Sequence, residues 1–202
     1  MTEKVTIGSA ELWLGDAGEV LPLLGDFDLL LTDPPYGLGE KLQGGTWGEN
    51  NAWDQTPVDG LLLDLARAHC TKQIIWGGNY YALMPTRGWL TWFKPDAVPS
   101  MASFEMAWTN IDMNARQLKH SIAATNAERC GHPTQKPVRV MEWSLTFWPA
   151  DTVLDAFMGS GTTGVACAHL GKQFVGIERE RKYFDMACER ISRAQAQERL
   201  FA

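Results

Sequence analysis

The run Thr32-Asp33-Pro34-Pro35-Tyr36 combines a carboxylate, proline carbonyls and an aromatic ring at one point of the chain. The apolar residues 27–31 before it predict a short buried strand, which must end at the prolines because they have no N–H for the ladder. A carboxylate and a carbonyl together accept two hydrogen bonds from one amino group, and a ring stacks on a flat heterocycle. The run therefore predicts a receptor for an amino group on a ring, beyond the carboxyl end of a strand. The alternative is a strand-ending turn with a core tyrosine.

A second motif lies in residues 152–178, where a strand, a glycine-rich turn, a helix and another strand follow one another. Gly159, Gly161 and Gly164 give the spacing G-x-G-x-x-G, and Glu178 lies 19 residues beyond Gly159. Glycines let the backbone approach a ligand closely, and an acid at the end of the second strand accepts from ribose hydroxyls. This context predicts a nucleoside-containing cofactor, rather than a turn that only packs.

The acid Asp155, four residues ahead of Gly159, bears on which cofactor binds. A dinucleotide places its pyrophosphate at a helix N-terminus, where a nearby acid would repel it. The same acid suits a cationic ligand. This favours S-adenosylmethionine, which carries an ammonium and a sulfonium.

The composition indicates one globular domain, since the 202 residues are 45% hydrophobic and 21% charged. No apolar stretch approaches the roughly 20 residues that span a bilayer, and the N-terminus lacks a signal-peptide pattern. A cytoplasmic protein with no membrane partner is therefore expected. The four cysteines are far apart and form no CxxC pair, so neither a metal site nor a disulfide framework is predicted.

Strands and helices alternate along the chain, which indicates an α/β protein with a mostly parallel sheet. Hydrophobic patterns predict strands over residues 5–7, 11–14, 27–32, 74–76, 89–93, 104–108, 152–156 and 173–177. They predict helices over residues 17–24, 57–70, 137–147, 165–170 and 181–199. Residues 37–56 form a long polar loop directly after Tyr36, which predicts either a cover over the substrate or a surface loop.

Three motifs, in this order, resemble the permuted (beta-class) DNA amino-methyltransferases. They are Asp33-Pro34-Pro35-Tyr36, His132-Pro133-Thr134-Gln135-Lys136-Pro137 and Phe157-Met158-Gly159-Ser160-Gly161-Thr162-Thr163. The resemblance covers nearly the whole chain and implies a Rossmann-like, circularly permuted fold. Its sheet would be mixed, mostly parallel and seven-stranded, with helices on both faces. The implied activity is methyl transfer from S-adenosylmethionine to an exocyclic amine in DNA, most often adenine N6 when the tetrad starts with Asp.

The resemblance also implies site residues. The cofactor set is Asp16, Asp33, Thr134, Lys136, Asp155, Phe157, Gly159, Ser160, Gly161, Thr162, Thr163 and Glu178. In it Glu178 would contact the ribose and Asp16 the adenine ring, although Asp16 could instead be only a helix N-cap. The catalytic set is Asp33, Pro34, Pro35 and Tyr36. Asp33 and the Pro34 carbonyl would accept the two amino hydrogens, and Tyr36 would stack on a base flipped out of the duplex.

DNA contacts are expected between residues 113 and 139, where basic residues predominate although the net charge of the chain is −6. The candidates for phosphate contacts are Arg116, Lys119, Arg129 and Arg139. A solvated surface is the alternative for each of them.

Residues 109–131 are shorter than the recognition region that family members carry between the corresponding motifs. We therefore expect one domain, with a catalytic half over about 1–108, a short loop or minimal recognition region over about 109–131, and a cofactor-binding half over about 132–202. This short form resembles the solitary methylases of phages and prophages. Family members often dimerise, which raises a homodimer as an option.

Other functions stay open from the sequence alone. They are methylation of the cytosine 4-amino group, methylation of RNA or protein, and a non-catalytic DNA-binding role on the same fold. Methylation of cytosine carbon 5 is disfavoured, because it needs a cysteine after a proline and none of the four cysteines follows one.

Overall fold

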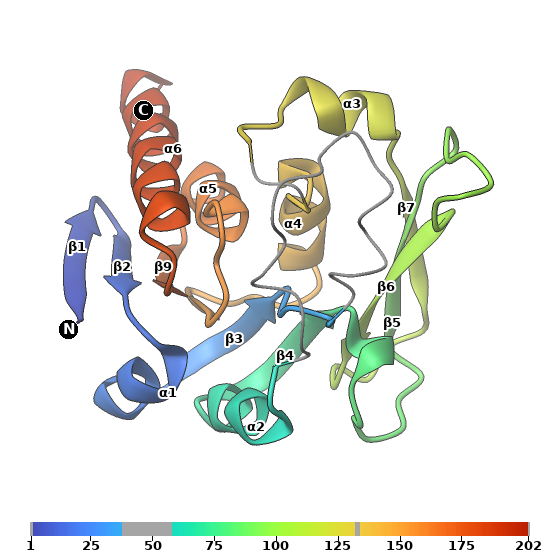
Figure 1. Ribbon diagram of the computed structural model, residues 1–202, viewed down its shortest axis with the longest axis horizontal. Coiled ribbons are helices and arrows are strands. Elements are labelled where there is room, and N and C mark those ends of the chain that lie inside the picture. The colour runs from blue at the N-terminus through green and yellow to red at the C-terminus, as the bar shows by residue number, and fades with distance from the viewer. Residues whose placement is uncertain (1, 38–57, 132–133, 202) are drawn as a thin grey trace.

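The computed structural model describes residues 2–37, 58–131 and 134–201 (Figure 1). In these ranges nine strands form one mixed sheet, in the order β1-β2-β9-β8-β3-β4-β6-β5-β7. The strands are β1 (Glu3–Ile7), β2 (Ala10–Leu14), β3 (Phe27–Thr32), β4 (Cys70–Trp76), β5 (Trp89–Phe93), β6 (Phe104–Thr109), β7 (Arg116–Lys119), β8 (Thr152–Asp155) and β9 (Gln173–Glu178). The predicted α/β fold with a mixed sheet is confirmed, whereas the predicted count of seven strands is wrong.

Five neighbouring strands, β2, β9, β8, β3 and β4, run parallel to one another in the centre of the sheet. Antiparallel pairing occurs between β1 and β2, between β4 and β6, and between β5 and β6. The carboxyl ends of the five parallel strands lie along one edge, where ligands bind in open α/β sheets. Both sequence motifs follow strands of this group, so the fold brings them together.

Helices cover both faces of the sheet. They are α1 (Ala17–Val20), α2 (Gly60–Ala68), α3 (Ile122–Ala127), α4 (Val138–Leu145), α5 (Thr162–His169) and α6 (Arg181–Phe201), with 3₁₀ turns at Leu21–Leu23 and Gly78–Tyr80. Figure 1 shows α4, α5 and α6 on one side of the sheet and α1 and α2 on the other. Side chains along β3 alternate accordingly, because Leu29 and Leu31 join the core beneath α4–α6 and Leu30 joins the core beneath α1 and α2.

Residues 109–131 are more ordered than expected. They contain the edge strand β7, which pairs in parallel with β5, and the helix α3. The alternative of a short loop is therefore wrong, and the alternative of a minimal recognition region stays a prediction. The four residues of β7 form an exposed edge and α3 has only six residues, so neither has a hydrophobic repeat long enough to reveal it.

The predicted loop 37–56 lies outside the described residues except for Gly37, as do His132 and Pro133 of the predicted motif at residues 132–137. In the described ranges no helix combines the length and the apolar character that crossing a bilayer requires.

Candidate active site

The elbow at residues 33–36 begins where β3 ends, between β8 and β4. The Pro35 carbonyl accepts a hydrogen bond from the Tyr81 hydroxyl, which fixes the turn. Among the described residues no donor reaches the Pro34 carbonyl. The elbow therefore presents the Asp33 carboxylate beside a carbonyl that can accept a further hydrogen bond.

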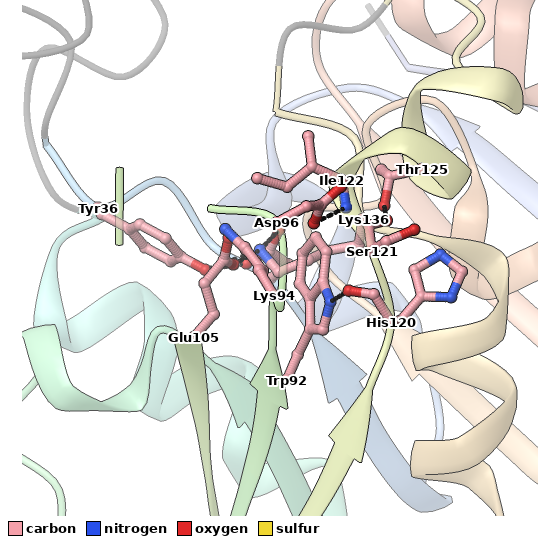
Figure 2. A network of polar contacts seen from close by, with 11 residues as sticks. Tyr36, Trp92, Lys94, Asp96, Glu105, His120, Ser121, Ile122, Thr125 and Lys136 are labelled. Carbon is pink, nitrogen blue, oxygen red and sulfur yellow. Dashed lines mark hydrogen bonds and ion pairs between the residues drawn. The ribbon is translucent and has the colours of Figure 1, made fainter. Parts of the chain in front are cut away.

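A chain of buried and partly buried charges surrounds this elbow (Figure 2). The Lys136 ammonium donates to Asp33 Oδ2 at 2.6 Å and to the Tyr36 hydroxyl at 3.0 Å, and it lies 3.0 Å from Glu105 Oε2. The Tyr36 hydroxyl also donates to Asp33 Oδ1, and Lys94 donates to Glu105. Only 6% of the Lys136 side chain is exposed, so this ammonium depends on its carboxylate partners for compensation.

The environment shifts the pKa of Asp33, Lys136 and Glu105 in this network. Burial raises the pKa of Asp33 against the opposing effect of Lys136. Burial also disfavours the charged form of Lys136, but the Asp33 and Glu105 carboxylates outweigh it and raise the pKa of Lys136. Burial likewise disfavours ionised Glu105, but Lys136 and Lys94 lower the pKa of Glu105 to about 2. With all four groups ionised, two ammoniums balance two carboxylates.

The Tyr36 ring is held from two directions. It stacks on the Tyr80 ring with centroids 4.8 Å apart and an interplanar angle of 21°. It also packs against Gly77, where a Cβ atom would stand 1.9 Å from the Tyr36 ring. Gly77 has φ +68°, which favours glycine on its own account. This packing holds the Tyr36 hydroxyl against Asp33.

The region after β7 is attached to the hairpin of β5 and β6. The Asp96 carboxylate accepts the backbone N–H groups of Ile122 at 2.7 Å and Ala123 at 2.9 Å, at the start of α3. The Trp92 indole donates to the His120 carbonyl at 2.8 Å. Figure 2 shows Asp96 with Ile122 and Trp92 with His120 beside the charge network. Ile122, Thr125 and Arg129 line the cavity at the elbow, so the short segment 109–131 forms a wall there.

Asp155 lies at the end of β8, with 2% of its surface exposed. Its oxygens accept from the Thr32 hydroxyl at 2.7 Å, the Thr163 hydroxyl at 2.6 Å and the Phe157 N–H at 3.1 Å. Burial raises the pKa of Asp155 to about 6 despite these hydrogen bonds. Asp155 therefore joins β3, β8 and the first turn of α5.

Glu178 ends β9 beside the glycine-rich turn. Its Oε2 accepts from the Gly159 N–H at 3.0 Å and its Oε1 from the Glu180 N–H at 2.7 Å. Burial raises the pKa of Glu178 to about 6. Each carboxylate oxygen retains a further lone pair, so Glu178 can still accept from a pair of hydroxyls.

The later glycines of the turn serve packing. A Cβ atom at Gly161 would stand 2.8 Å from the Ala187 Cβ, and one at Gly164 would stand 2.4 Å from the Ile191 Cδ1. Both contacts are with α6. Of the three glycines in G-x-G-x-x-G, only Gly159 lines the cavity that lies over this turn.

Two cavities meet at the elbow. The first, of about 290 Å³, lies over the glycine-rich turn and is called the turn cavity below. Its lining includes most of the predicted cofactor set: Asp16, Asp33, Thr134, Lys136, Asp155, Phe157, Gly159, Ser160, Thr162, Thr163 and Glu178. The second, of about 400 Å³, is called the elbow cavity and is lined by Asp33, Pro34, Tyr36, Tyr80, Trp92, Met101, Phe104, Glu105, Ile122 and Arg129, among others. Asp33, Pro35 and the segment 134–136 line both.

The turn cavity suits a cationic nucleoside better than a diphosphate. Six acids line it, namely Asp16, Asp33, Asp59, Asp155, Glu178 and Glu180, against the two bases Lys136 and Arg179. The Gly159 N–H, which could receive a phosphate, already donates to Glu178. This acidic lining therefore fits S-adenosylmethionine, the cofactor that the sequence predicts.

Comparison with known proteins agrees with this geometry. The N6/N4 methyltransferase family, described as DNA methylase, matches residues 97–189. The type II methyltransferase M.HpaI of Haemophilus parainfluenzae is 26% identical over 215 residues, which cover 81% of this chain and 68% of that protein. The type II methyltransferase M2.LlaDCHI of Lactococcus lactis subsp. cremoris is 42% identical over 64 residues, which cover 31% of this chain and 24% of that protein.

Solved structures are similar over most of both chains. The structure of the M1.HpyAVI–SAM complex has a TM-score of 0.62 and 25% identity, and the match covers 90% of this chain and 99% of that one. The chain is a homologue of DNA methyltransferases. The PvuII DNA methyltransferase (cytosine-N4-specific), at 16% identity, has a TM-score of 0.60 over 95% of this chain and 93% of that one, which shows a shared fold alone.

The predicted site residues of this methyltransferase homologue fall into three groups. The catalytic set and most of the cofactor set lie around the two cavities, whereas Gly161 does not line the turn cavity. Asp16 both lines that cavity and caps α1 by accepting from the Gly18 N–H at 2.8 Å. The four predicted DNA contacts are spread out, with Arg116 and Lys119 on β7, Arg139 on the surface of α4 and Arg129 in the elbow cavity.

Arg190 on α6 supports the glycine-rich turn, and sequence reasoning missed it. One guanidinium nitrogen, Nη1, donates to the Ser160 carbonyl at 2.6 Å, to the Ser160 hydroxyl at 2.9 Å and to the Thr162 hydroxyl at 3.1 Å. Burial lowers the pKa of Arg190. The only signal in the sequence was an arginine within the apolar repeat of the last helix.

Replacement of Arg190 by Met should loosen the turn while keeping the apolar stem in place. We expect cofactor affinity to fall about tenfold, because charged hydrogen bonds of this kind contribute about 1.5–3 kcal/mol. Calorimetric titration with S-adenosylmethionine measures the change. Arg193→Met is the matched control, since Arg193 pairs with Glu189 on the exposed side of the same helix. Equal affinities of the two variants would contradict the role of Arg190.

Proposed function

We propose that this protein transfers a methyl group from S-adenosylmethionine to the 6-amino group of adenine in DNA. The observation that carries the proposal is the wall shared by the two cavities. Asp33, Pro35 and residues 134–136 separate the turn cavity, which fits the cofactor, from the elbow cavity, which is left for a base. A group in one cavity can thus meet a group in the other at the Asp33 carboxylate.

S-adenosylmethionine is the cofactor, and when bound it supplies an electrophilic methyl group. Glu178 would hold the ribose through the lone pairs that its backbone donors leave open. Asp16, exposed at the rim of the turn cavity, would face the adenine ring. The Thr134 and Lys136 end of the cavity lies beside Asp33, so it would take the methionine portion.

The elbow prepares the target nitrogen. The lone pair of an aromatic amine is delocalised into the ring, so the nitrogen is a poor nucleophile. Asp33 and the Pro34 carbonyl would accept its two hydrogens, which favours a pyramidal nitrogen with a free lone pair. Holding the reactants in place in this way can contribute about 7–11 kcal/mol. Asp33 performs this role as a carboxylate, and Lys136 supports that form.

The target base must leave the duplex to reach the elbow, at a cost of a few kcal/mol. Apolar and aromatic side chains of the elbow cavity, among them Trp92, Met101 and Phe104, offer it a surface. Stacking on an aromatic residue returns about 1–3 kcal/mol. Tyr36 is the proposed stacking residue, although one stacking partner, Tyr80, is already in place.

The same proposal covers the organisation of the chain. We infer one domain of permuted order, because β8 and β9 from the end of the chain lie between β2 and β3 from its beginning. The cofactor half is then completed by β2, whose next residue, Gly15, donates to the Glu178 carbonyl at 2.9 Å. Phage or prophage origin, a cytoplasmic location and a homodimer belong to the proposal as expectations.

The deciding experiment identifies the product. The purified protein is incubated with tritiated S-adenosylmethionine and unmethylated duplex DNA, and the DNA is digested to nucleosides for mass analysis. N6-methyl-2′-deoxyadenosine supports the proposal, whereas N4-methyl-2′-deoxycytidine would show that the target base is cytosine. Single-stranded DNA and RNA are parallel acceptors. Absence of label in every acceptor would favour a non-catalytic DNA-binding protein.

Replacement of Glu178 by Ala should weaken cofactor binding about 10- to 100-fold, because charge-assisted hydrogen bonds to the ribose are lost. Isothermal calorimetry with S-adenosylmethionine measures the affinity. Glu189→Ala, on the exposed side of α6, is the control and should bind as the wild type does. An unchanged affinity of Glu178→Ala would contradict the ribose assignment.

A further inference from the structure

Four charged groups alternate in sign across the elbow cavity, in the order Lys94, Glu105, Lys136, Asp33, and Lys136 is buried while the other three are partly buried. Lys94 and Glu105 come from the hairpin of β5 and β6, Lys136 precedes α4, and Asp33 follows β3. Figure 2 shows the labelled members Lys94, Glu105 and Lys136 converging from these separate elements, beside Tyr36. All four line the elbow cavity.

The position of the Lys136 ammonium matters for the proposed reaction. It donates to Asp33 Oδ2 at 2.6 Å and to the Tyr36 hydroxyl at 3.0 Å. The Asp33 carboxylate is the group that an incoming amino group must reach, and an ammonium and an aromatic amine are both hydrogen-bond donors. In this structure Lys136 therefore takes one of the two lone pairs of Asp33 Oδ2 and competes with the incoming amino group for that oxygen.

Glu105 offers Lys136 a second carboxylate besides Asp33. Its Oε2 lies 3.0 Å from the Lys136 ammonium, while its Oε1 receives Lys94. A small shift of the ammonium toward Glu105 frees Asp33 without leaving Lys136 uncompensated. Without Glu105, Asp33 is the only carboxylate that the structure places against Lys136.

We propose that Glu105 is a positioning residue for methyl transfer, which holds the Lys136 ammonium off Asp33 when the target amino group enters the elbow cavity. This inference rests on the proposed function. It makes Lys136 a residue shared between two carboxylates, and it gives the hairpin of β5 and β6 a part in the reaction. The role is exerted through Lys136, so Glu105 need not touch the base.

Charge counting gives a test that a purely structural role would not pass. The network carries two positive and two negative charges. Glu105→Gln leaves an excess of one positive charge and keeps Lys136 on Asp33, whereas Lys136→Met leaves an excess of one negative charge. The double variant is neutral again and has no ammonium competing for Asp33.

The experiment measures single-turnover methyl transfer to duplex DNA at saturating tritiated S-adenosylmethionine, together with calorimetric affinity for the cofactor. We expect Glu105→Gln to transfer about 100-fold more slowly than the wild type, as a misplaced catalytic group does, with unchanged cofactor affinity. The double variant Glu105→Gln with Lys136→Met should be faster than Glu105→Gln and should match Lys136→Met, because Glu105 acts through Lys136. Both Lys136→Met proteins lack the same side chain, so any cofactor contact of Lys136 cancels between them.

The matched control is Glu142→Gln. Glu142 pairs with His169 at 2.8 Å, and its side chain is 25% exposed, as is that of Glu105. Transfer by Glu105→Gln at the rate of Glu142→Gln would overturn the proposal, and so would a double variant slower than Lys136→Met. If thermal denaturation shows that Glu105→Gln does not fold, the comparison of Lys136→Met with the double variant decides alone. An inactive wild-type protein would instead reject the proposed function.

Discussion

Asp33→Ala should abolish methyl transfer, with a loss of at least about 10²- to 10³-fold, as when a group that stabilises a transition state is removed. In the proposed mechanism the carboxylate is the acceptor that activates the amine, and no other acid follows β3 at the elbow. Cofactor binding should persist within about tenfold, because the rest of the turn cavity is unchanged. Single-turnover transfer and calorimetry measure the two quantities on the same preparation.

Two further variants separate chemistry from stability in this prediction. Asp33→Asn keeps the shape of the side chain and removes its charge, so it should be as inactive as Asp33→Ala. Asp64→Ala, on the exposed side of α2, is the control and should be fully active. Full activity of Asp33→Asn would show that the carboxylate is not the required acceptor. A loss of cofactor affinity equal to the loss of activity would place Asp33 in binding instead.

The two motifs could be predicted from the sequence because each is contiguous. An apolar strand followed by two prolines fixes an elbow within five residues, and the strand, glycine-rich turn and helix of residues 152–164 carry their own geometry. Parallel strands then bring their carboxyl ends to one edge of the sheet. That rule alone predicts that Asp33, Asp155 and Glu178 lie near one another, and the structure places them around one cavity.

The partners of those residues could not be predicted, because their contacts join distant parts of the chain. Lys136 and Asp33 are 103 positions apart, and Arg190 and Ser160 are 30 apart. Nothing in the local pattern marks Glu105 as a partner of Lys136, since an acid within a strand is also typical of a solvent-facing position. Edge strands such as β7 were missed for a related reason, since a short exposed strand needs no apolar alternation.

Tyr36 illustrates how a neighbour changes the interpretation of a motif. The sequence indicates a ring for stacking, whereas the structure also gives its hydroxyl a hydrogen bond to Asp33 and its ring a place against Gly77. Gly77 has no polar group and lies 41 positions after Tyr36 (77 − 36). Its effect on the site arises only from the space that it leaves open.

Gly77→Ala should therefore lower activity although it replaces none of the predicted site residues. The added methyl group would stand 1.9 Å from the Tyr36 ring, so the ring must move and the hydrogen bond from its hydroxyl to Asp33 is lost. We expect methyl transfer to fall about 100-fold, as for other displacements of about 1 Å near reacting groups. Cofactor affinity should not change, since Gly77 lines only the elbow cavity.

Gly171→Ala is the control that isolates this displacement. Gly171 has φ +62°, close to the +68° of Gly77, but a Cβ atom there meets nothing within 4 Å. Both variants should lose about 1–2 kcal/mol of stability from the left-handed backbone, and only Gly77→Ala should lose activity. Tyr36→Phe completes the comparison, because it removes the hydroxyl and leaves the ring in place. If Gly77→Ala is slow and Tyr36→Phe is fast, the ring itself is what the reaction requires. If both variants are slow, the reaction requires the hydrogen bond from the Tyr36 hydroxyl to Asp33.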